Sequence, residues 1–135
     1  MRSDLIAKLL QDNGAGKIGS TIFLHFMPVE CKKGVLIKEP LAGMQTNNEL
    51  PGFYKTRFQI IVRAPTQTEG DALVKIIQKA ILMKQERSFY EPGSNAFAMK
   101  VLHCLPDSLP IRFPRLEGNE IEWSLNYQIS FVIPE

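Results

Sequence analysis

The sequence predicts an α+β protein, with a single antiparallel β-sheet of about four or five strands and helices packed on one face. Two segments, 54–64 and 121–133, alternate strictly between apolar and polar residues, which is typical of half-buried strands. Two others, 3–12 and 66–84, carry apolar residues at helical spacing. The chain has 135 residues, of which 44% are hydrophobic and 22% charged, so we expect one domain over 1–135 with a sizeable core.

The first helix is expected to begin at Ser3 or Asp4, either of which can cap it, and to end at the glycines of 13–16. Segment 20–27 predicts a strand that is apolar on both faces and closes at Pro28, which suits a central strand or a face covered by a partner. Segment 34–38 predicts a short strand that pairs with it through the turn at 30–33.

Residues 50–84 form the unit on which the core is built. A turn at 50–52 leads into a strand from Tyr54, and Pro65 ends that strand because proline has no N–H to donate. Thr66 and Glu69 fit a capping box at the start of a helix that extends to about residue 84. Its apolar stripe should pack on the even-numbered face of the strand just completed.

The rest of the chain predicts two more strands, at 96–105 and 121–133, and long loops at about 39–53, 85–96 and 106–119. The last loop holds prolines at every fourth position, at 106, 110 and 114, which block helix and ladder alike. We predict that this extended arm contacts a partner. The apolar residues that it would present are Leu109, Ile111, Phe113 and Leu116.

Several functional classes find little support. No apolar run approaches the roughly 18 residues that span a bilayer, and the first residues lack the pattern of a signal peptide, so we expect a protein made in a cytoplasm and no membrane partner. A formal charge of +2 is too small to argue for nucleic-acid binding by itself. Cys31 and Cys104 form no CxxC pair and favour reduced, structural thiols.

No motif predicts catalysis, a metal or a cofactor. Gly16-Lys17 lacks the frame of a phosphate-binding loop, because Gln11 stands at the first glycine position and Ile18 follows the lysine. A zinc site would draw on His25, Cys31, His103 and Cys104. The last two are neighbours on a predicted strand and point to opposite faces, which leaves too few ligands. A Cys–His nucleophilic pair lacks local support as well.

Charged residues form two stripes on predicted strands. Lys55, Arg57 and Arg63 share one strand face, and Glu120 and Glu122 share another. The basic stripe has the charge to follow a phosphate backbone, but no aromatic residues alternate with it to stack on bases. A solvated surface, charge pairing across strands and contacts between subunits remain open for both stripes.

Three short motifs resemble the tail-terminator proteins of long-tailed bacteriophages, also known as minor capsid or tail completion proteins. These are Leu50-Pro51-Gly52-Phe53, the strand 58–63, and Glu69-Gly70 leading into Leu73, Ile77 and Ile81. The order of predicted elements agrees over most of the chain.

The resemblance implies a structural virion protein and no enzyme. It implies a homo-oligomeric, hexameric ring, assembled in the host cytoplasm, at the head-proximal end of a tail tube. The ring would stop polymerisation of the tube protein and dock a head-completion or connector protein, and DNA would pass through its lumen without sequence-specific binding. Lys55, Arg57, Arg63, Glu120 and Glu122 are candidates for subunit-interface or lumen charges, because a closed ring needs two complementary patches per subunit. A head-completion ring protein is the nearest alternative, followed by a nucleic-acid-binding module and an enzyme of unknown activity.

Overall fold

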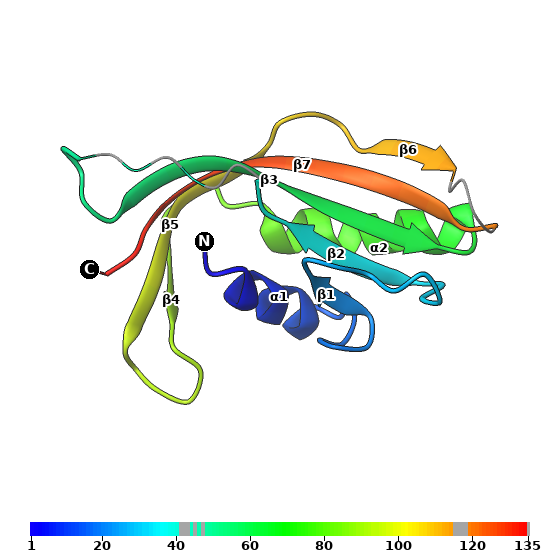
Figure 1. The fold of residues 1–135 in the computed structure, drawn as a ribbon, viewed down its shortest axis with the longest axis horizontal. Helices are drawn as coiled ribbons and strands as arrows, with labels where there is room; N and C mark the ends of the chain where they lie inside the picture. The colour runs from blue at the N-terminus through cyan, green and yellow to red at the C-terminus, as the bar shows by residue number, and fades with distance from the viewer. Residues whose placement is uncertain (41–43, 45, 47, 115–118, 135) are drawn as a thin grey trace.

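The computed structural model of the chain describes residues 1–40, 44, 46, 48–114 and 119–134, and within them it forms two helices and seven strands. The strands form one strongly curled sheet that arches over both helices (Figure 1). In chain order the elements are α1 (Ser3–Asp12), β1 (Ile22–Leu24), β2 (Gly34–Lys38), β3 (Phe53–Ala64), α2 (Gln67–Ile81), β4 (Arg87–Tyr90), β5 (Phe97–Pro106), β6 (Ile111–Pro114) and β7 (Ile121–Val132).

The sheet is mixed, with the strand order β1-β2-β3-β7-β5-β4 and with β6 paired to β7 beside β5. The predicted α+β class with helices on one face is confirmed, but the sheet has more strands than the expected four or five. It is also not wholly antiparallel, because β1 and β2 run parallel. The hairpin expected through residues 30–33 is therefore wrong. The chain turns away after β1 at His25, which has a φ of +75°, and segment 25–33 brings it back to the same end before β2 begins.

Strands β4 and β6 lie inside segments predicted as loops. Each has only four residues and pairs on one side, β4 with β5 and β6 with β7. Most of their side chains are exposed and both strands are short, so neither carries a run of apolar alternation long enough to reveal a half-buried strand. Edge strands of this length are therefore difficult to recognise from periodicity.

The unit formed by β3 and α2 is confirmed. The Thr66 hydroxyl accepts a hydrogen bond from the Glu69 N–H at 3.3 Å, which caps α2 as predicted. The apolar stripe of α2, including Leu73 and Ile77, is buried with the even-numbered face of β3. The helix ends at Ile81, three residues earlier than expected.

Helix α1 begins without the predicted side-chain cap. The residue at the cap position is Arg2, and Ser3 and Asp4 lie in the first turn, where their side chains bind elsewhere. The Ser3 hydroxyl donates to Glu39, and the Asp4 carboxylate accepts from Arg2. The contact with Glu39 joins the start of α1 to the segment that follows β2.

The longest predicted strand, β7, organises the centre of the sheet. It pairs with β3 along its whole length, from Phe53 opposite Val132 to Ala64 opposite Ile121. The aromatic rings of the two strands stack across the ladder on the buried face, with centroids 5.4 Å and 5.6 Å apart. The buried hydrophobic residues of β7 are Trp123, Leu125, Tyr127, Ile129 and Phe131.

Candidate assembly surfaces

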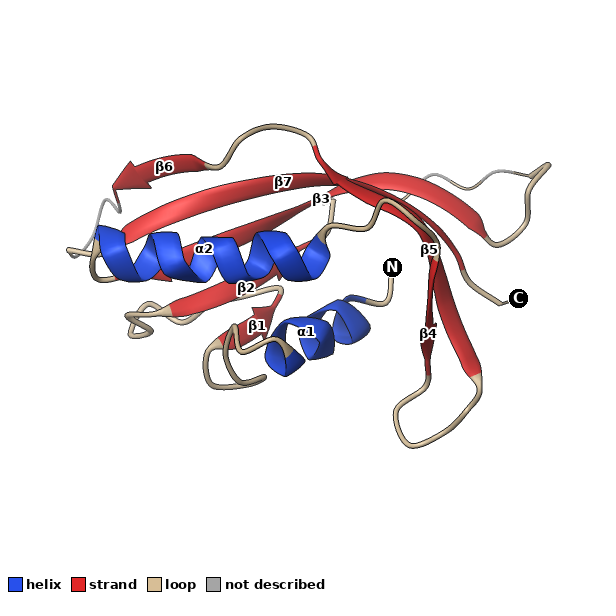
Figure 2. Ribbon diagram, turned by 180° about the vertical axis from the view of Figure 1, so that it is seen from behind, coloured by secondary structure: helices blue, strands red, loops and turns tan. Residues whose placement is uncertain are grey.

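Both helices lie on the concave side of the sheet, and no helix of the described chain covers the other side, which we call the outer face (Figures 1 and 2). Odd-numbered residues of β3 and even-numbered residues of β7 point to the outer face, because their neighbours fill the core. The predicted basic stripe lies there. Its three cations have different surroundings.

Lys55 and Arg57 are exposed on the outer face. The Arg57 side chain is 72% exposed, and its Nε lies 3.3 Å from Asp107 Oδ2. Lys55 makes no ion pair with any residue that the structure describes. The exposed ion pair between Arg57 and Asp107 contributes little to the stability of the fold. Because the side chains of Lys55 and Arg57 are both exposed, they remain accessible to a partner.

Arg63 is instead bound inside its own chain. Only 7% of the residue is exposed, and its Nε donates to Glu122 Oε2 at 2.9 Å across the β3–β7 ladder. Its Nη1 donates to the carbonyls of Pro28 at 2.8 Å and Cys31 at 3.0 Å. The side chain therefore fastens the segment between β1 and β2 to the centre of the sheet.

Glu120 is also buried, at 4% exposure, and its Oε1 lies 2.8 Å from Lys32 Nζ. Glu120 thus binds Lys32 of the 28–33 segment, and Glu122 binds Arg63 of β3. Among the five charged candidates, the structure brings Arg63 and Glu122 together. It separates Lys55 and Arg57 from them.

The residues predicted to contact a partner belong to the 106–119 loop. Its segment 109–113 is apolar except for Arg112, and from here on we call this segment the arm. Leu109 is 84% exposed, Ile111 53% and Phe113 36%. Ile111 and Phe113 lie opposite Ser124 and Glu122 of β7, so they project from the outer face. The fourth residue of the prediction, Leu116, lies outside the described residues.

A cleft of about 530 Å³ lies at the other edge of the sheet, between the 14–16 turn and the first half of α2. We call it the cleft. Small and apolar residues line it, chiefly Ala15, Gly34, Ala72, Leu73 and Ile76, and Lys33 and Glu69 lie among its polar lining residues. It combines three segments that are distant in the sequence, so no local pattern could have predicted it.

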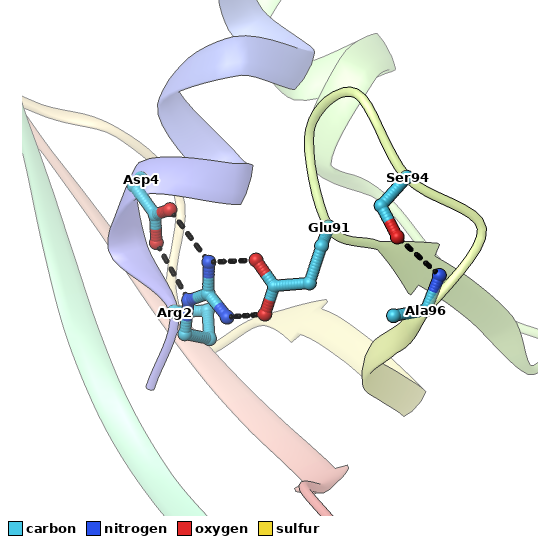
Figure 3. Close-up of polar contacts among 5 residues, drawn as sticks. All are labelled: Arg2, Asp4, Glu91, Ser94 and Ala96. Atoms are coloured by element: carbon cyan, nitrogen blue, oxygen red, sulfur yellow. Dashed lines mark hydrogen bonds and ion pairs between the residues drawn. The ribbon is translucent and has the colours of Figure 1, made fainter.

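A second feature without a sequence signal is an ion-pair cluster at the tip of the β4–β5 hairpin (Figure 3). Arg2 donates to both oxygens of Glu91, at 2.5 Å and 3.0 Å, and to both oxygens of Asp4, at 3.0 Å and 2.9 Å. These hydrogen bonds to Arg2 hold the pKa of Asp4 and of Glu91 below the usual carboxylate value. The cluster, which we call the clamp, connects α1 to the hairpin.

The residues considered for catalysis or metal binding do not converge. Cys104 lies in the core, and burial raises the pKa of its thiol to about 12. His103 points to the outer face, where its Nε2 lies 3.0 Å from Ser130 Oγ. Within the described ranges no three histidine, cysteine or carboxylate side chains are grouped as metal ligands would be. Neither helix is long and apolar enough to cross a bilayer.

Comparisons with known proteins identify the family of the chain. Residues 9–133 match the family described as bacteriophage tail terminator protein. No curated protein is significantly similar to the sequence. Among solved structures, a chain from the virion of native gene transfer agent (GTA) particle has the same fold, with a TM-score of 0.63 over 96% of each chain at 7% identity.

The family match extends over nearly the whole sequence, including the last four residues of α1, all of α2, the arm and β7. Members of this family are structural components of the virion tail and are not enzymes. The chain belongs to the bacteriophage tail terminator family and is a structural protein of the virion tail.

Proposed function

We propose that this chain forms a ring, hexameric by resemblance to the family, on the head-proximal end of a completed tail tube. The ring stops polymerisation of the tube protein and provides the surface on which a head-completion or connector protein docks. The observation that supports this most is the family match over residues 9–133. The exposed side chains of the arm and of Lys55 and Arg57 support it further, because they are accessible to a partner.

A ring of identical subunits needs two different patches on each subunit, because contacts run head to tail around the circle. Lys55 and Arg57 suit a contact with an acidic surface of a neighbouring subunit, the tube or the docking partner. Arg63, Glu120 and Glu122 are less suited to it, because each is bound within its own chain. DNA passing through the ring needs no sequence-specific contact, and on the outer face of β3 no aromatic residue alternates with Lys55, Arg57 and Arg63 to stack on bases.

The test is electron microscopy of a lysate from a phage that lacks this gene. We expect DNA-filled heads beside unattached tails of abnormal or uncontrolled length, and complementation by the intact gene should restore normal particles. Leaking or empty heads beside tails of normal length would instead move the protein to the head side of the joint, as a head-completion protein. Normal infectious particles would contradict both structural roles.

A charge-reversal variant, Lys55→Glu with Arg57→Glu, tests the assignment of the outer face. Both side chains are exposed, so the variant should fold as the native chain does, while head docking or subunit contact is lost. Unchanged assembly and infectivity would remove these two residues from the proposal. A gel shift at low and moderate salt separates this from DNA binding, which would weaken steeply with salt.

A further inference from the structure

The arm and the cleft lie at opposite edges of the sheet and at the same level along the strands. Strand registers place Phe113 opposite Glu122, Glu122 opposite Arg63, and Arg63 opposite Gly34, which lines the cleft. This row crosses the sheet from β6 to β2, next to the terminal strand β1. One subunit therefore carries an exposed apolar projection on one side and an apolar recess on the other.

The two features are complementary in kind. The arm presents Leu109 and Ile111 more than half exposed and close together in the chain, as in apolar patches that mark contacts with other proteins. The cleft presents Ala72, Leu73 and Ile76 from α2, together with residues 14–16, in a volume of about 530 Å³ that has room for an aliphatic side chain.

Charged residues in the arm and in the cleft bear on how the arm would be oriented in the cleft. Arg112 is an exposed cation within the arm that lies opposite Trp123 and so points to the α2 side of the sheet, and Glu69 is an exposed carboxylate in the lining of the cleft. The cleft also contains Lys33, so an inserted arm is favoured when Arg112 lies toward Glu69 and away from Lys33. We therefore expect these charges to favour one orientation of an inserted arm.

We propose that the arm of one copy inserts into the cleft of the next, with Leu109 as its apolar anchor, and that this contact closes the ring. The inference rests on the proposed ring and assigns the surfaces that build it. A second copy is the occupant because projection and recess are different surfaces of one chain at opposite edges. Such a contact is heterologous, and repeated contacts of this type close into a ring when the rotation between subunits permits.

Disulfide trapping tests this contact in assembled tails. In a Cys31→Ser background, which leaves only the buried Cys104, Leu109→Cys and Ala72→Cys are introduced into separate copies that are expressed together. Tails are purified, oxidised and separated by non-reducing denaturing electrophoresis. We expect a disulfide-linked dimer from the mixture and almost none from either variant alone. A dimer from Leu109→Cys alone would indicate contact between two arms and would overturn the proposal.

A chain that carries both cysteines allows the same experiment to report the number of subunits in the ring. Head-to-tail trapping around a closed ring should give a ladder of oligomers that ends at the number of subunits in the ring. Tail length is measured by electron microscopy in the same preparation. Absence of crosslinks in tails of normal length overturns the arm-and-cleft contact and leaves the proposed function standing. If tails assembled with the native chain have uncontrolled lengths, the proposed function itself is contradicted.

Two substitutions make the test independent of cysteine chemistry. Leu109→Asp should leave the urea midpoint of the isolated chain unchanged, because the side chain is 84% exposed, yet reduce the yield of correctly terminated tails about tenfold or more. Ala72→Phe should act in the same way by filling the cleft. The matched controls are Leu50→Asp, which is 53% exposed outside the arm, and Lys79→Phe on the exposed side of α2. Equal tail yields from all four variants would overturn the proposal.

Discussion

The indole ring of Trp123 lies directly against Gly70, in the space that a side chain at position 70 would occupy. A Cβ built on Gly70 would lie 1.9 Å from Trp123 Cη2, much closer than any real contact. A glycine inside a helix is normally unfavourable by about 1 kcal/mol relative to alanine. Here it allows α2 to approach β7 closely, which explains why a glycine follows the capping box.

We therefore predict that Gly70→Ala destabilises the protein by about 1–3 kcal/mol, although the helix itself gains from alanine. The urea midpoint measures this, and Asp71→Ala at the next, exposed helical position serves as the control. A Gly70→Ala, Trp123→Phe double variant should recover part of the loss, because the smaller ring vacates the space. A higher midpoint for Gly70→Ala would show that the indole does not lie against the helix.

Arg63 and Arg57 provide a second test, since they share one face of one strand. Arg63→Met should destabilise the fold by about 3–5 kcal/mol, because it leaves the Glu122 carboxylate unpaired and removes the donor to two loop carbonyls. Arg57→Met should change stability by less than about 1 kcal/mol, because its ion pair is exposed. Chemical denaturation of the two variants compares them, and similar losses would contradict the contrast in burial.

The contrast between the two arginines also shows what the sequence could predict. Periodicity placed both residues correctly on the outer face of β3, because alternation follows from strand geometry alone. It could not show that segment 28–31 folds over Arg63, since that depends on a loop of irregular conformation. The same pattern that grouped the charges therefore could not tell a structural pair from an accessible one.

The same distinction separates the elements of the fold that periodicity could predict from those that it could not. The β3–α2 unit and β7 were predictable, because each buries one face and so carries a clear period. Strands β4 and β6 were not, because both faces are largely exposed, and the parallel pairing of β1 with β2 depends on the path of a loop. The arm was predicted from its prolines and apolar residues, but the cleft required three distant segments to come together.

The clamp predicts a pH-dependent change confined to the hairpin tip. The pKa of Glu91 and of Asp4 is lowered in the native state, so the native protein binds fewer protons than the unfolded chain at these sites. The contribution of the clamp is thus present above the unfolded carboxylate pKa of about 4 and is lost as the pH falls through the lower native values.

Amide exchange at Glu91 and Ser94, whose N–H groups bond to Ala96 and Glu91, reports on this tip. Protection should fall in acid in the native chain, whereas Glu91→Gln should reduce protection already at neutral pH and lose most of the acid step. Glu86→Gln is the control, because its carboxylate lies 3.7 Å from Lys100 and outside the clamp. Unchanged protection in Glu91→Gln would show that Arg2 does not hold the hairpin.

The two cysteines should differ strongly in reactivity. Burial raises the pKa of the Cys104 thiol to about 12, and the thiolate is the species that reacts, so at about pH 8 this residue should be nearly inert to a thiol-specific reagent. Cys31 is partly exposed and should react quickly. We expect one thiol per chain to react quickly in the native protein and two in denaturant.

In Cys31→Ser the fast phase should disappear. The slow phase that remains should report on opening of β5 from Met83, since Cys104 and Met83 exchange both backbone hydrogen bonds. A fast phase that persists in Cys31→Ser would contradict the burial of Cys104 and, with it, the packing of β5 on the core.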